Sequence, residues 1–174
     1  MNFLIKTNRL LIKPFELTHI TEEYLSWMND KEILSFSEQR HKKHTFETSK
    51  RYLSSFYNSG NMFLAIEEKS NDIGHVGNMS IYIDSNNGIA DLSIMIGNHE
   101  AQQQGYATEA WTAICKYLLT RTDIRKITAG TLSINLPMIR IMKKAGMRED
   151  GKRTMHYKVN DEYIDLLYMA IFRD

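Results

Sequence analysis

The stretch QQQGYATEA at residues 102–110 has the residue types and spacing of an anion-binding turn. It follows the alternating apolar run IADLSIMI and precedes apolar residues at helical spacing. A chain that passes from a strand into a helix exposes backbone N–H groups that no helical carbonyl accepts, at the positive end of the helix dipole. Gly105 lets an anion approach the backbone, and Ala107 keeps the next turn small. The stretch therefore predicts an anion site at the start of a helix.

The common phosphate-binding motifs of nucleotide enzymes are absent here. The stretch has neither the spacing of a Walker phosphate loop nor Gly-x-Gly-x-x-Gly. A polar loop that merely begins an amphipathic helix therefore stays open as the simpler interpretation.

The elements that position this stretch are predicted from periodicity and turn residues. Strands are expected at 9–15, 62–67, 73–83, 89–96, 126–132, 152–159 and 163–172, and helices at 17–29, from about 45, at 105–120 and at 136–145. This order predicts an α+β (mixed α/β) fold in one domain, residues 1–174, with helices packed on a central, mostly antiparallel sheet of about seven strands.

Two of these helices carry a clear prediction of their buried side. On the helix at 105–120, one buried stripe is expected from Ala107, Ala110, Trp111, Ile114 and Leu118. On the helix that begins near Thr45, the expected buried residues are Phe46, Tyr52, Leu53 and Phe56.

With these elements in place, QQQGYATEA resembles the pyrophosphate-binding signature of the GNAT superfamily of N-acetyltransferases, Gln/Arg-x-x-Gly-x-Gly/Ala. Gln102, Gly105 and Ala107 fill its three defining positions. TNRLLIKPF, SWMNDKEI, NLPMIRIMKKAGM and YIDLLYMAIF extend the resemblance over nearly the whole chain. They are similar to the branch of ribosomal-protein N-terminal and spermidine acetyltransferases.

The resemblance implies how acetyl-CoA binds. The fourth and fifth predicted strands, 89–96 and 126–132, would splay apart, helices would cover both faces of the sheet, and the pantetheine arm would lie in the gap. Backbone groups of the first strand, N–H groups of the turn and Asn135 would hold the cofactor. The implied cofactor-binding residues are Ile94, Met95, Ile96, Gln102, Gln103, Gln104, Gly105, Tyr106, Ala107, Thr108 and Asn135.

The chain departs from the family pattern at three positions. Gln103 stands where many relatives have glycine, which is tolerable if only its backbone is used. Met138 replaces a frequent serine, and Met142 replaces a frequent tyrosine that protonates the leaving thiolate. A thiol of pKa ~8.5 needs little help to leave near neutral pH, so the absence of that tyrosine need not abolish activity.

The acceptor amine must be neutral to attack. An α-amino group, of pKa ~7.7–8, is partly neutral at pH 7, whereas a lysine-like amine near ~10.4 needs a stronger base. Asp91 and His156 are the candidate catalytic bases, each against the alternative of an ordinary strand residue.

We expect an N-acetyltransferase with direct transfer from acetyl-CoA to a primary amine. The acceptor is a protein N-terminus by resemblance, an amino group of a nucleotide-linked sugar, or a polyamine. A non-catalytic module of the same fold that binds CoA or acyl-CoA is the alternative.

Composition and charge bear on nucleic-acid binding, membrane insertion, compartment and metal binding. With 22 basic and 21 acidic residues, the net charge of +1 argues against nucleic-acid binding, and no apolar run approaches the ~20 residues of a membrane span. The single cysteine, Cys115, fits a reducing cytoplasm. His41 and His44 lack a third partner, so no metal site is expected. A monomer and a homodimer both stay open.

Overall fold

The computed structural model describes residues 3–70 and 72–173, so the first two residues, residue 71 and the last residue of the predicted domain lie outside it. The helices are α1 (Glu22–Met28), α2 (Phe46–Ser54), α3 (Tyr106–Thr120) and α4 (Leu136–Lys144), with short 3-10 segments at Leu17–His19 and Glu38–His41. The strands are β1 (Ile5–Lys6), β2 (Leu10–Pro14), β3 (Met62–Glu68), β4 (His75–Asp84), β5 (Ile89–Ile96), β6 (Lys126–Leu132), β7 (Arg148–Val159) and β8 (Glu162–Phe172).

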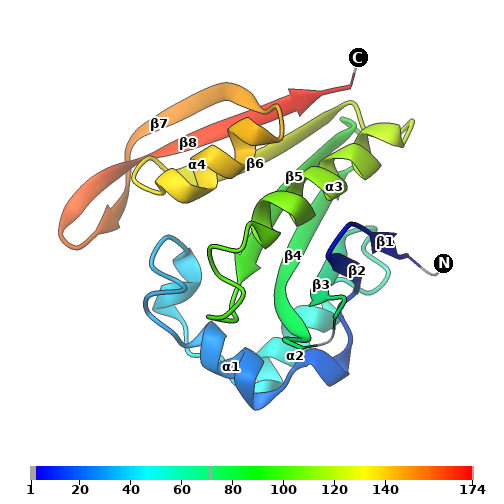
Figure 1. The fold of residues 1–174 in the computed structure, drawn as a ribbon. Coiled ribbons are helices and arrows are strands. Elements are labelled where there is room, and N and C mark those ends of the chain that lie inside the picture. Colours follow the sequence, from blue (N-terminus) through cyan, green and yellow to red (C-terminus); the bar gives the residue numbers. More distant parts are fainter. Residues whose placement is uncertain (1–2, 71, 174) are drawn as a thin grey trace.

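All eight strands belong to one sheet, in the order β1-β2-β3-β4-β5-β6-β8-β7 (Figure 1). Every neighbouring pair is antiparallel except β5 and β6, which are parallel. The predicted α+β fold with a mixed sheet is confirmed. The sheet has one strand more than the about seven expected, because Ile5 and Lys6 pair with β2 as a short edge strand.

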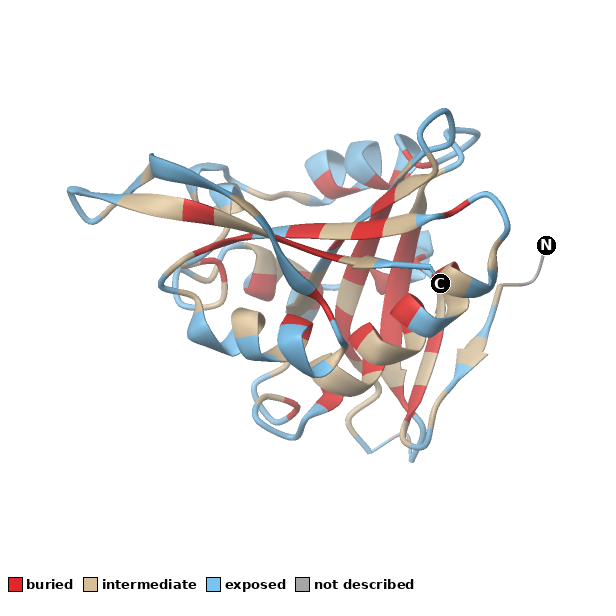
Figure 2. Ribbon diagram, turned by 90° about the horizontal axis from the view of Figure 1, so that it is seen from above, coloured by how far each residue is buried: buried red, intermediate tan, exposed pale blue. Residues whose placement is uncertain are grey.

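Helices cover both faces of the sheet. Along β3, Leu64 and Ile66 belong to the core shared with α3, whereas Phe63 and Ala65 belong to a second core shared with α1 and α2. This alternation is the period of two that a strand imposes on its side chains. Figure 2 shows the buried residues concentrated on the central strands and on the helix sides that face them.

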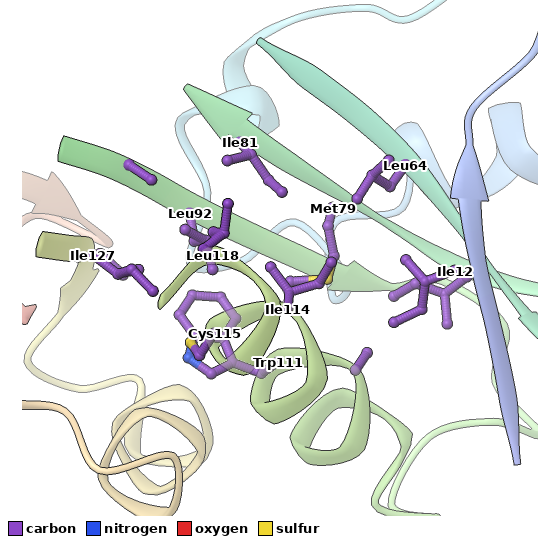
Figure 3. Close-up of a cluster of buried hydrophobic side chains, with 14 of the residues drawn as sticks. Ile12, Leu64, Met79, Ile81, Leu92, Trp111, Ile114, Cys115, Leu118 and Ile127 are labelled. Carbon is purple, nitrogen blue, oxygen red and sulfur yellow. The ribbon is translucent and has the colours of Figure 1, made fainter. Parts of the chain in front are cut away.

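The larger core lies under α3. Ala110, Trp111, Ile114 and Leu118 are fully buried, as the helical spacing predicts, and Figure 3 shows Ile114 and Leu118 beside the strand residues Met79 and Leu92. Burial of each large side chain stabilises the fold by about 1.5–3 kcal/mol. Ala107, the first residue of the predicted stripe, is only half-buried, because it lines a cavity.

The prediction for α2 is half wrong. Leu53 and Phe56 are buried as expected, but Phe46 is 39% exposed and Tyr52 is 37% exposed. Phe46 is the first residue of the helix, and the hydroxyl of Tyr52 is bonded to Ser80 rather than enclosed in the core. Among the described residues, no helix is both long enough and apolar enough to cross a membrane.

Candidate functional site

The site is built around the point where β5 and β6 separate. Their pairing comprises only three residue pairs and ends with Asp91 opposite Thr128. Beyond it, β5 continues along β4 to Ile96, and β6 continues along β8 to Leu132. Each diverging strand thus keeps a hydrogen-bonded neighbour on its outer edge, which is why the sheet can open without exposing both edges of either strand. The predicted splay is confirmed, with β5 and β6 as its two strands.

A cavity of about 1030 Å³ lies at this splay. This volume is at the upper end of the ~300–1,000 Å³ usual for small-molecule sites, enough for a ligand of considerable size or for two ligands. We call one side the α4 half, which includes residues of β5, of the turn before α3, of the start of α3, and of α4 with its cap: Ile94, Ile96, Gln102, Ala107, Asn135 and Met138. We call the other side the α2 half, which includes residues of α2, β4 and the segment between α1 and α2: Glu32, Lys42, Lys43, His44, Ser49, Tyr52, Asn78, Ser80 and Tyr82.

The turn before α3 presents a run of free backbone donors. Gln103 and Gly105 adopt left-handed φ values of 60° and 81°. In the described part of the chain, the N–H groups of residues 103–108 make no hydrogen bond of standard geometry, and the first helical bond at this end runs from the N–H of Glu109 to the carbonyl of Gly105. We call this run of backbone donors at the N-terminus of α3 the nest, because successive free N–H groups beside the positive end of a helix dipole are suited to an anion.

An ion pair fixes this turn to the start of β2. The Arg9 Nε donates to Glu109 at 2.8 Å, its Nη1 donates to the carbonyl of Gln104 at 2.8 Å, and its guanidinium lies 4.5 Å from the ring centre of Tyr106. The same carboxylate accepts from the Thr7 hydroxyl at 2.6 Å. Although desolvation opposes it, these hydrogen bonds hold the pKa of Glu109 below its ordinary value. Glu109 is therefore ionised and binds Thr7 and Arg9, which connects the start of α3 to the residues before β2.

Comparison with known proteins identifies the family. A family model described as an acetyltransferase (GNAT) domain matches residues 9–148. The chain belongs to the GNAT acetyltransferase family. The recognition from QQQGYATEA is thereby confirmed, together with acetyl transfer as the class of activity.

Individual relatives match this chain over nearly its whole length. The uncharacterized N-acetyltransferase YnaD of Bacillus subtilis (strain 168) is 26% identical over 172 residues, which cover 98% of this chain and 97% of YnaD. RimL, a ribosomal L7/L12 alpha-N-protein acetyltransferase solved with coenzyme A, has a TM-score of 0.85 at 16% identity and 99% coverage of both chains. Spermidine N-acetyltransferase from Vibrio cholerae, solved with CoA and spermine, has a TM-score of 0.80 at 18% identity, with 96% of this chain and 97% of that chain covered.

The predicted cofactor residues of this GNAT chain lie together. Ile94, Met95 and Ile96 line the cavity from β5, and Gln102 and Ala107 line it from the turn and from α3. The remaining predicted turn residues form the nest described above: Gln103, Gln104, Gly105, Tyr106 and Thr108.

Asn135 lines the cavity and caps α4. Its side-chain oxygen accepts from the N–H of Met138 at 3.3 Å, and its Nδ2 donates to the Thr131 hydroxyl at 3.0 Å. The two unusual methionines differ in position. Met138 lines the cavity, whereas Met142 is fully buried in the core under α3. Neither methionine side chain carries a proton to donate to a leaving thiolate.

The two predicted bases are not brought together. Asp91 closes the β5–β6 pairing and accepts from the Thr128 hydroxyl at 2.7 Å. Desolvation by the surrounding protein raises the pKa of Asp91, and the bond from Thr128 partly opposes this. His156 is exposed on β7, with its ring 4.8 Å from that of Tyr157. Neither residue is among those that line the cavity.

Several polar groups of the α2 half were missed from the sequence. The hydroxyl of Tyr52 lies 2.9 Å from both Ser80 Oγ and the Tyr82 hydroxyl. Ser49 Oγ and Asn78 Oδ1 are buried without a hydrogen-bond partner in the described chain. A signal was present, because Asn78, Ser80 and Tyr82 are polar residues at alternate positions of one predicted strand and so share a face.

Among residues 3–70 and 72–173, no group of three or more His, Cys, Asp or Glu side chains is arranged to hold a metal ion.

Proposed function

We propose that this chain binds acetyl-CoA in the α4 half of the cavity and transfers the acetyl group to a primary amine held in the α2 half. The observation that carries the proposal is the nest of free N–H groups over residues 103–108, at the N-terminus of α3 and beside the splay. Such donors, with the positive end of a helix dipole, suit a diphosphate. Relatives solved with coenzyme A support the same donor.

The chain offers further groups for the rest of the cosubstrate. The edge of β5 beyond Asp91 has no strand partner toward β6 in the described chain, so backbone groups of residues 94–96 are free to bond the amides of a pantetheine arm. Asn135, Met138 and Ile94 would line the path of that arm. The thioester supplies the acetyl group, activated for attack by an amine.

Direct transfer requires little acid–base help. The amine nitrogen bonds the acetyl carbon, the carbon–sulfur bond breaks, and the amine loses a proton while the thiolate gains one. Met138 donates no proton, but a thiol of pKa ~8.5 departs readily near neutral pH.

For the amine, we propose Asp91 rather than His156 as the base. Asp91 and Tyr82 are register partners on β5 and β4, so their side chains share a face, and Tyr82 lines the cavity. Asp91 would act through a bridging water, which is sufficient for an amine of pKa ~7.7–8.

An assay on three kinds of acceptor tests the proposal. The purified chain is mixed with acetyl-CoA and a peptide N-terminus, an amino sugar or a polyamine, and both free thiol and acetylated amine are measured. The proposal predicts equal amounts of both products with at least one acceptor class. Binding of acetyl-CoA without transfer to any amine would instead indicate a non-catalytic acyl-CoA-binding module.

A further inference from the structure

The α2 half of the cavity carries an excess of positive charge. Lys42 and Lys43 line it, and neither pairs with a carboxylate among the described residues. Glu32 is the only carboxylate in the described lining. The nearby carboxylate of Glu38 is bound to Arg40 at 2.8 Å and so is partly neutralised. A polycation would meet two ammonium groups and one carboxylate here, which is unfavourable at short range.

The same half of the cavity contains one buried hydroxyl that lacks a hydrogen-bond partner in the described chain. Ser49, in the second turn of α2, is only 6% exposed, lines the cavity, and its Oγ makes no hydrogen bond in the described chain. Asn78, on strand β4, also lines the cavity, and its Oδ1 is likewise buried without a hydrogen-bond partner in the described chain. An unsatisfied buried polar group is costly, and both residues line the cavity, so both groups are available to hydrogen-bond a polar ligand there.

The rest of this surface is also rich in hydroxyl groups. Thr48 and the hydrogen-bonded set of Tyr52, Ser80 and Tyr82 line the same half. Phe36, 41% exposed, provides an aromatic wall against which an apolar ring face can pack. The α2 half of the cavity therefore combines several hydroxyl groups with the two unpaired ammonium groups of Lys42 and Lys43.

We infer that the acceptor is a small polyhydroxylated amine that carries a phosphate group, with the phosphate held by Lys42 and Lys43 and the hydroxyl groups held by the Ser49 and Asn78 region. The inference rests on the proposed acetyl transfer and adds the class of its acceptor. The phosphate is either a terminal monoester or the diphosphate of a nucleotide-linked sugar, since both present the same oxygens to the lysines.

Matched acceptors test this directly. The value of kcat/KM is measured for glucosamine, for glucosamine 6-phosphate, for a nucleoside-diphosphate-linked amino sugar, for spermidine and for an acidic peptide N-terminus. At least one phosphorylated sugar is expected to exceed glucosamine by about tenfold or more, the scale of one or two charge-assisted hydrogen bonds. The better of the two phosphorylated sugars identifies the form of the phosphate.

Two variants link that preference to the lysines. In the double variant K42Q/K43Q, the preference for the phosphorylated sugar should fall by about tenfold and become insensitive to salt. The control K50Q/K116Q, at exposed lysines of α2 and α3 outside the lining, should keep it. In Ser49→Ala, KM should rise for both sugar forms, because the lost hydroxyl contacts the sugar body.

The dissociation constant for acetyl-CoA, measured on the same samples, separates the two proposals. Unchanged acetyl-CoA binding in K42Q/K43Q with loss of the phosphate preference supports the inference. Equal kcat/KM for glucosamine and its phosphorylated forms, or a preference for spermidine or the acidic peptide, overturns it while leaving the proposed acetyl transfer intact. Absence of acetyl-CoA binding in the unmodified chain overturns the proposed function itself.

Discussion

Arg9 and Glu109 are 100 residues apart in the sequence, and the Arg9 Nε donates to Glu109 Oε2 at 2.8 Å. Arg9 directly precedes β2, and Glu109 lies in the first turn of α3. Because Arg9 also donates to the carbonyl of Gln104, the pair holds the turn whose N–H groups form the nest. The conformation of this turn therefore depends on a contact with the N-terminal strands of the sheet.

Replacement of Arg9 tests that dependence. We expect Arg9→Gln to weaken acetyl-CoA binding by about five- to tenfold, because the turn loses two donors that fix its orientation. The free energy of unfolding should fall by only about 0.5–1 kcal/mol, since the Arg9 side chain is 40% exposed. Calorimetric titration and urea unfolding measure the two effects. Arg121→Gln, which removes a similar ion pair to Asp123 just beyond the far end of α3, is the matched control and should leave affinity unchanged. Equal affinities for the two variants would contradict a role of Arg9 in the site.

Gln103 distinguishes backbone from side-chain recognition. Its φ of 60° lies in the left-handed region that glycine adopts freely. Gln103→Gly should relieve strain and gain chain entropy in the unfolded state, so that stability changes by less than about 1 kcal/mol. Acetyl-CoA affinity should stay within about twofold of the original, because only the N–H of residue 103 is used. A tenfold loss in a calorimetric titration would show that the glutamine side chain binds the ligand.

Met142 and Met138 should respond differently to the residues frequent in relatives. Met142→Tyr forces a larger side chain into a site with no exposed surface and should cost about 1–3 kcal/mol in the free energy of unfolding. Met138→Ser, at a half-buried position on the cavity wall, should cost less, about 1 kcal/mol. Chemical unfolding of both variants checks this order, and a stable Met142→Tyr protein would show that the tyrosine finds space outside the core.

His75 predicts a loss of stability in weak acid. Burial among aromatic rings, with His19 close by, lowers the pKa of His75 from 6.5 to about 4. The unfolded chain therefore binds a proton that the folded chain excludes between these values. Above pH 6.5, His75 is neutral in both states and does not lower the free energy of unfolding. As the pH falls from 6.5 toward 4, protonation of His75 in the unfolded chain lowers the free energy of unfolding by at most about 3 kcal/mol.

The matched variant for this prediction is His75→Gln, whose amide can still donate to the carbonyl of Gly77, as His75 Nε2 does at 2.9 Å. Urea unfolding between pH 7 and pH 4 should show a shallower decline for His75→Gln than for the unmodified chain. Identical declines would assign the acid sensitivity to other groups.

Local signals predicted much of this fold. Thr45 and Asn135 cap α2 and α4 through bonds to nearby N–H groups, and contacts so close in sequence can be inferred from residue type. Helical spacing likewise identified the buried side of α3.

Contacts between segments far apart in the sequence account for the features of the site that could not be predicted. The bond between Arg9 and Glu109 joins distant segments, and nothing in the spacing of either segment announces it. Tyr52 was expected in the core from its helical position, but polar partners on β4 keep it at the cavity. Asp91 and His156 were chosen by residue type, and their distance from the cavity lining depends on how the sheet opens.

The central claim is that the backbone nest before α3 binds acetyl-CoA, and a calorimetric titration of two glycine variants tests it most directly. Gly105 and Gly60 have similar φ values, 81° and 76°, so valine strains the backbone equally at either position. Only Gly105 lies in the nest. Acetyl-CoA is expected to bind to the unmodified chain and to Gly60→Val with the same affinity, and to Gly105→Val at least about tenfold more weakly. No binding to the unmodified chain at high micromolar acetyl-CoA, or equal affinities for the two variants, would contradict it.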